Sequence, residues 1–200
     1  MKILEKFIIN ENVWIEVVIP SDDKKINYFY EPTAKLHQFD EASAILRNNK
    51  KKLLLYKNTV DEIFFKLRYF LNKVIKKEFI ITDEQFIGKI DVYYNIDKYR
   101  QWKNDEGGET LSPDALEYLD YFLYSSDESQ TWLYSDGKVI YMEVGYSVPC
   151  LFSSDMDYSD KDFELFLKNY KNLFFEHISF DTALEWIALC TKMLNKIGVQ

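Results

Sequence analysis

The chain has 200 residues, of which 47% are hydrophobic and 17% aromatic, with only six glycines and four prolines. This composition excludes an intrinsically disordered chain and predicts a single folded domain over residues 1–200. The net charge is −8, and residues 105–164 hold 15 Asp/Glu against two lysines, which argues against nucleic acids and anionic membranes as partners because both attract positive charge.

The first half of the chain is predicted to contain short strands and a short helix. Residues 2–9 and 13–19 read as two strands, residues 26–30 as a third, and residues 53–56 as another. Residues 39–47 read as a short helix, because two carboxylates stand in the first turn of that segment.

The longest helix is predicted over residues 59–78. Apolar side chains recur there at the 3.6-residue spacing of an amphipathic helix. Thr59 and Glu62 fit a capping box at its start, and lysines in its last turns match the helix dipole.

The middle of the chain gives a less uniform pattern. Residues 85–102 fit both a helix start and an extended run, so their structure is left open. Residues 104–110 form a polar, glycine-containing loop. Ser112 then caps a predicted helix whose buried stripe consists of Ala115, Leu116, Leu119, Phe122 and Leu123.

Residues 131–148 predict an antiparallel hairpin, which we expect inside a sheet packed by helices. Asp136 and Gly137 stand between two runs of β-branched, aromatic and apolar residues, as in a tight turn. One face of the second strand is apolar and consists of Ile140, Met142, Val144, Tyr146 and Val148. The other face carries Val139, Tyr141, Glu143 and Gly145.

Two helices are predicted after the hairpin. Ser159 caps one over residues 163–175, and a break follows at residues 177–178. Ser179 caps a final helix that ends at Gly198 and buries Phe180, Ala183, Leu184, Ile187, Leu194 and Ile197. The order of elements lacks regular strand–helix alternation. We therefore expect an α+β fold, with an antiparallel sheet packed by several amphipathic helices.

The sequence predicts no metal and no cofactor. Residues 153–164 resemble a calcium loop, but Asp160 stands where glycine is required and Phe166 where a bidentate glutamate is required. The two histidines are not in ligand spacing, and there is no CxxC motif. The two cysteines do not make a disulfide scaffold, and we see no signal peptide or membrane span. We therefore expect a reducing cytoplasm.

A small enzyme is the first alternative. Cys150 and His177 would be its nucleophile and base, or Glu143 its general base, although a strand glutamate is more often solvent-facing or hydrogen-bonded. Cys190 lies among apolar neighbours and reads as a core thiol. Because the chain contains no glycine-rich phosphate loop and no GxSxG motif, we expect that it is not an enzyme.

The acidic block 105–164 predicts a docking face for a basic protein partner. Its charge is concentrated in two loops, at 104–110 and 153–160, with the hairpin between them. Clustered carboxylates would speed the encounter with a cationic partner. The expected partner-binding residues are Asp105, Glu106, Glu109, Asp155, Asp157 and Asp160. The alternative is a solvated face that keeps the protein soluble.

The stretches WLYSDGKVIYMEVGYSVP and FELFLKNYKNLFFEHISFDTALEWIALCTKML resemble the C-terminal half of bacterial toxin-immunity proteins of the contact-dependent inhibition or polymorphic toxin type. The features that carry the resemblance are Trp132, Tyr134, Glu143, Pro149, Tyr170, Ile178 and Trp186. The resemblance implies a cytoplasmic, non-enzymatic inhibitor that neutralises a cognate toxin domain, often a nuclease with a basic cleft. A structural or adaptor protein is the second alternative.

Overall fold

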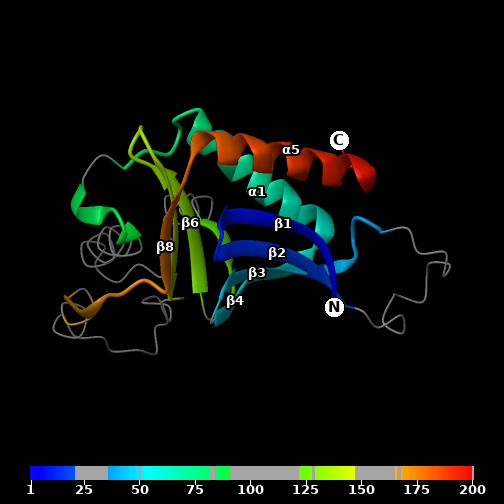
Figure 1. Ribbon diagram of the computed structural model, residues 1–200, viewed down its shortest axis with the longest axis horizontal. Helices are drawn as coiled ribbons and strands as arrows, with labels where there is room; N and C mark the ends of the chain where they lie inside the picture. Colours follow the sequence, from blue (N-terminus) through cyan, green and yellow to red (C-terminus); the bar gives the residue numbers. More distant parts are fainter. Residues whose placement is uncertain are drawn as a thin grey trace, which may run out of the picture.

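The protein is described from a computed structural model (Figure 1). The described residues are 1–20, 36–49, 51–81, 84–90, 122–127, 129–146, 165 and 168–199. Within these residues the chain forms two four-stranded antiparallel sheets and two α-helices. The predicted α+β class is confirmed, with two sheets where one was expected and two helices where several were expected.

The first sheet is a meander in which the strands lie in chain order. Its strands are β1 (Lys2–Asn10), β2 (Val13–Ile19), β3 (Glu41–Asn48) and β4 (Lys51–Thr59). Phe7 pairs with Ile15, which pairs with Leu46, and all three side chains are buried on the same face. The predicted strands at 2–9, 13–19 and 53–56 are confirmed.

Strand β3 shows that the helix predicted over residues 39–47 was wrong. Alanine, leucine and arginine in this segment favour helices in isolation. However, β3 lies between β2 and β4 and is hydrogen-bonded on both sides. Ala42, Ala44 and Leu46 are buried with a period of two, so tertiary pairing overrides local propensity here. The strand predicted at 26–30 lies outside the described residues.

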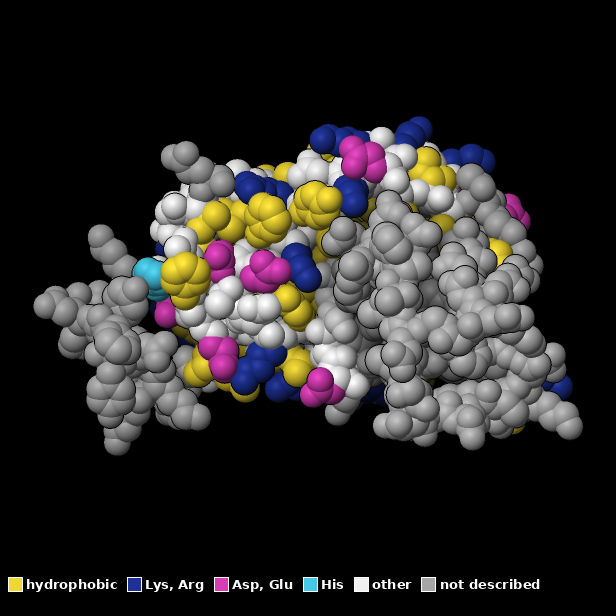
Figure 2. Space-filling view, turned by 180° about the vertical axis from the view of Figure 1, so that it is seen from behind, with side chains coloured by type: hydrophobic (Ala, Val, Ile, Leu, Met, Phe, Trp, Pro, Cys, Tyr) yellow, Lys and Arg dark blue, Asp and Glu magenta, His cyan; other side chains and the backbone are white. Residues whose placement is uncertain are grey.

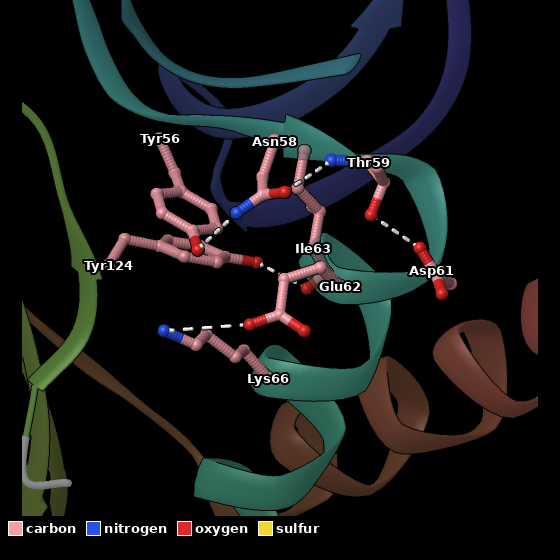
Figure 3. A network of polar contacts seen from close by, with 8 residues as sticks. All are labelled: Tyr56, Asn58, Thr59, Asp61, Glu62, Ile63, Lys66 and Tyr124. Carbon is pink, nitrogen blue, oxygen red and sulfur yellow. Dashed lines mark hydrogen bonds and ion pairs between the residues drawn. The ribbon is translucent and has the colours of Figure 1, made fainter. Parts of the chain in front are cut away.

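Helix α1 (Val60–Ile75) confirms the long helix, which ends three residues earlier than predicted. The predicted capping box does not form. Instead, the Thr59 hydroxyl donates to the Asp61 carboxylate, and Glu62 pairs with Lys66 at 3.7 Å (Figure 3). The buried side of the helix consists of Val60, Ile63, Phe64, Leu67, Phe70, Leu71 and Val74.

The second sheet contains the predicted hairpin, which is confirmed. Its strands are β5 (Phe122–Ser125), β6 (Ser129–Ser135), β7 (Ile140–Tyr146) and β8 (Phe174–Ile178). In the turn between β6 and β7, the Asp136 carboxylate accepts the backbone N–H groups of Lys138 and Val139, each at 2.8 Å. Gly137 has a φ of +92°, which glycine adopts without strain.

Strands β5 and β8 correct the ends of two predicted helices. Phe122 and Leu123 belong to β5, and residues 174–175 belong to β8. A short apolar run does not by itself distinguish a helix from a strand. The pairing of β8 with β7 decides the matter at the second site. The remaining residues of the first predicted helix lie outside the described part of the chain. In the second, residues 165, 168 and 169 are helical, whereas residues 170–173 are not, so the prediction was wrong there.

Helix α5 (Phe180–Lys196) confirms the final predicted helix. Ser179 caps it by accepting the backbone N–H of Thr182 at 3.0 Å. The buried stripe consists of Ala183, Trp186, Cys190, Met193 and Leu194. Leu184 was expected inside but is 55% exposed, because it lies beside this stripe rather than on it.

One hydrophobic core joins the two sheets and the two helices. Phe7 of β1 packs edge-on against Trp186 of α5, with ring centroids 5.4 Å apart. Tyr124 of β5 stacks on Tyr56 of β4 and donates its hydroxyl to the backbone carbonyl of Ile63 in α1 at 2.8 Å (Figure 3). Strands of both sheets are thus in contact with α1.

Candidate functional site

The second sheet is buried on both faces. Leu133, Met142 and Val144 belong to the main core. The opposite face is covered by the chain that follows α1, which includes the short 3-10 helix η1 (Glu84–Phe86). This second buried layer contains Phe79, Ile81, Ile90, Trp132 and Tyr134.

Glu143 lies in the middle of β7 on this second face. Its side chain is fully buried, and its backbone pairs with Trp132 of β6 on one side and with Phe175 of β8 on the other. Burying a carboxylate is costly unless hydrogen-bond donors replace the water that it loses. The role of Glu143 therefore depends on the groups that surround it.

Donors from three separate parts of the chain converge on Glu143. The Tyr134 hydroxyl donates to Oε2 at 2.9 Å, and the Tyr170 hydroxyl donates to Oε1 at 3.2 Å. The backbone N–H of Ile90 donates to Oε1 at 3.2 Å and also lies 3.3 Å from Oε2. These neutral donors compensate the carboxylate for its burial and fix its direction.

Tyr134 connects the network to Gly88 and, through Gly88, to Asn172. Its oxygen accepts the backbone N–H of Gly88 at 2.9 Å, and the Gly88 carbonyl accepts the Asn172 side-chain amide, also at 2.9 Å. Burial and the neighbouring charge of Glu143 raise the pKa of Tyr134 well above its ordinary value. The hydroxyl therefore stays protonated and remains a donor to Glu143.

The residues that flank the segment 91–121 on both sides lie next to the Glu143 network. Ile90, which donates to Glu143, is the last described residue before this segment. Phe122, the first described residue after it, pairs with Trp132, and Trp132 is the neighbour of Glu143 across the sheet. The chain therefore leaves the described fold beside the Glu143 side chain and rejoins it at Phe122, next to the cross-strand neighbour of Glu143.

Residues 147–164 also begin and end close in sequence to residues of the Glu143 network. Tyr146, the last described residue before this segment, follows Glu143 on β7. Tyr170 donates to Glu143 soon after the chain returns at Leu165. Glu143 thus accepts a hydrogen bond from the residue directly before the first segment and from a residue shortly after the second.

The six partner-binding residues expected from the sequence lie in these two segments, outside the described residues: Asp105, Glu106, Glu109, Asp155, Asp157 and Asp160. The described residues carry 17 Lys/Arg and 15 Asp/Glu, and the remaining residues carry 8 Lys/Arg and 18 Asp/Glu. Residues 91–121 and 147–164 by themselves carry 4 Lys/Arg and 13 Asp/Glu, so most of the acidic excess of the chain lies in these two segments.

The other expected groups are placed as follows. Cys190 is a buried core thiol, as predicted, and burial raises its pKa well above the ordinary value. His177 is an exposed residue of β8, and Cys150 lies outside the described residues.

A shallow pocket of about 210 Å³ lies between the β3–β4 turn and the start of β8, lined by Leu46, Asn48, Lys51, Lys52, Leu53, Leu173 and Phe174. The described residues that line it include no carboxylate, thiol or imidazole.

Metal-binding and membrane-spanning features can be judged only for the described residues. Among them, no group of three or more His, Cys, Asp and Glu side chains could hold a metal ion. None of the helices in the same part of the chain is long and apolar enough to cross a membrane.

The sequence identified Glu143 but not its partners. Ile90 and Tyr170 are 53 and 27 residues away from it, and no local pattern connects residues at such distances. One available signal was the carboxylate itself, which stands on a strand face beside Tyr141 and opposite two aromatic residues of the preceding strand. In comparisons with known proteins, no family model, curated protein or solved structure matches this chain.

Proposed function

We propose that the protein is a cytoplasmic inhibitor of the immunity type. It binds a cognate bacterial toxin domain with a basic, nuclease-type surface, and the carboxylates of residues 91–121 and 147–164 make the contact. The supporting observation is that Ile90, directly before the first acidic segment, and Tyr170, shortly after the second, both donate to buried Glu143. The resemblance of the second half of the chain to immunity proteins points in the same direction.

Attachment around one buried group has an electrostatic consequence. Carboxylates that start from a common, rigid part of a sheet act together on an approaching cation, which raises the association rate. A fixed attachment also reduces the conformational entropy lost on binding. The contacts are assigned to Asp105, Glu106, Glu109, Asp155, Asp157 and Asp160.

The test begins with a search for a toxin-like open reading frame beside the gene of this chain, and the catalytic domain that such a frame encodes is purified; the absence of a toxin-like neighbour would count against the proposal. We expect a stoichiometric complex that abolishes toxin activity. In one variant, three carboxylates of the acidic segments are reversed to lysine: Asp105, Glu109 and Asp157. The matched control makes the same change of charge at three exposed carboxylates of the described fold: Glu11, Glu78 and Glu185.

The first variant should associate more slowly, and its association rate should depend less on salt, because screening has fewer attractive charges to act on. The control should keep a rate and salt dependence near those of the wild type. An equal loss of association rate in the two variants would mean that association depends on net charge alone and not on the acidic segments. A complex that forms equally well with both variants would rule out the acidic segments as the contact.

A further inference from the structure

Helix α1 exposes two aromatic rings on the side that faces away from the core. Phe65 and Tyr69 are one helical turn apart and are 45% and 44% exposed. Their rings are stacked, with centroids 6.3 Å apart and planes 8° from parallel. The fold gains little from this exposed area, and exposed aromatic clusters are typical of interaction sites.

Cations accompany the two rings. The Arg68 guanidinium lies 6.0 Å from the centre of the Phe65 ring, and the Lys73 ammonium lies 4.9 Å from the centre of the Tyr69 ring. Residues 63–77 contain five Lys/Arg and no Asp/Glu, in a chain of net charge −8. Figure 2, which views the molecule from behind, shows hydrophobic side chains in a row, with lysine and arginine side chains and also some aspartate and glutamate side chains beside them.

The helix that carries these residues is held firmly from below. Tyr124 donates to the Ile63 carbonyl, and the Lys66 ammonium lies 5.1 Å from the centre of the Tyr56 ring while pairing with Glu62 (Figure 3). A partner would therefore meet a surface whose backbone is already ordered, which lowers the entropy cost of binding.

We propose that this surface, defined by Phe65, Arg68, Tyr69 and Lys73 and named the α1 face, docks a protein segment in which carboxylates flank a bulky apolar side chain. The rings would bury the apolar side chain, and the cations would pair with the carboxylates. Aromatic residues and arginine are the side chains most enriched at the energetic centres of interfaces. The proposal uses none of the acidic segments and does not depend on the immunity function.

Charge also weighs against three other occupants. A symmetric contact between two copies through the α1 face would bring Arg68 and Lys73 of each copy towards the same cations of the other. Single-stranded nucleic acid would suit stacked rings with cations, and anionic lipid would suit the cations. The overall charge of −8 repels both of these polyanions at long range, and more strongly than it repels a short segment that carries only a few carboxylates.

The experiment selects short random peptides, displayed on phage, against the full-length chain. We expect the enriched peptides to be acidic and to carry an aromatic or large aliphatic residue. The best sequence is then synthesised and titrated against F65S/Y69S, against R68E/K73E, and against the control L184S/K192E. The control makes similar changes at exposed positions of α5. Circular dichroism and melting curves confirm that each variant is folded.

Both α1 variants should bind the peptide about tenfold more weakly or worse, and the control should bind like the wild type. For R68E/K73E the loss should be larger at low salt, where screening is weakest. The proposal is overturned if no peptides are enriched, if the enriched peptides are neutral or basic, or if both α1 variants keep their affinity.

Three parallel measurements address the other occupants. Binding to polyuridylic acid tests for nucleic acid, and binding to phosphatidylserine vesicles tests for lipid. Sedimentation of the free protein tests for a second copy. We expect no binding to the first two and no self-association through the α1 face. Binding or self-association that F65S/Y69S abolishes would assign the α1 face to that occupant and overturn the proposal.

Discussion

Replacing Glu143 by alanine tests the buried network directly. The change removes the acceptor of the Ile90 N–H and of the Tyr134 and Tyr170 hydroxyls. A buried donor without an acceptor costs about 1–3 kcal/mol. Tyr170 is only half-buried and can turn to water, and the variant no longer buries a carboxylate. We therefore expect the free energy of unfolding to fall by about 2–4 kcal/mol.

Two further variants make this measurement specific. Glu143→Gln keeps the shape but presents an amide N–H₂ to one of the donors, so we expect a smaller loss of about 1–2 kcal/mol. Glu185→Gln on exposed α5 should stay within about 0.5 kcal/mol of the wild type. Urea unfolding gives the free energies, and hydrogen exchange at the Ile90 amide reports the bond itself. If Glu143→Ala left both stability and Ile90 exchange unchanged, Glu143 would not be the anchor described above.

Three other predictions follow from local geometry. The backbone N–H groups of Lys138 and Val139 hold the pKa of Asp136 below its ordinary value. The stability that this carboxylate adds is therefore present above its unfolded-state pKa and is lost as pH falls through the folded-state pKa. In Asp136→Asn the melting temperature should fall less on acidification than it does in the wild type. Cys190 should resist alkylation in the folded protein and react after unfolding, as measured by peptide mass spectrometry. Gly88 has a φ of +74°, so Gly88→Ala should lower the free energy of unfolding by about 1–2 kcal/mol in urea titrations.

The elements with strong local signals could be predicted from the sequence. The turn at Asp136 and Gly137, the apolar stripe of α1 and the Ser179 cap of α5 each depend on residues a few positions apart. Strands β3 and β8 could not be predicted in the same way, because their residues also fit helices. Their state is set by hydrogen bonds to strands distant in the sequence.

The same difference between local signals and contacts distant in the sequence applies to the candidate site. Glu143 could be identified as a strand carboxylate, with solvent exposure or a hydrogen bond as its expected state. Its burial depends on the chain after α1 covering that face of the second sheet, and its donors include the backbone of Ile90. A backbone donor leaves no trace in side-chain chemistry, so no reading of residue types could have found it.

The last prediction separates the structural role of the Glu143 network from its role in binding. Tyr170→Phe removes one half-buried hydroxyl, so the free energy of unfolding should change by at most about 1 kcal/mol. The same bond helps to fix the chain where it returns from residues 147–164. If that attachment positions the carboxylates for the toxin domain, Tyr170→Phe should weaken the complex, because the freed segment loses more entropy on binding. Tyr146→Phe is the control, since Tyr146 lies on the same strand as Glu143 and is 54% exposed. Unchanged toxin affinity in Tyr170→Phe, measured beside this control, would mean that the network serves folding alone, and the proposed function would lose its structural support.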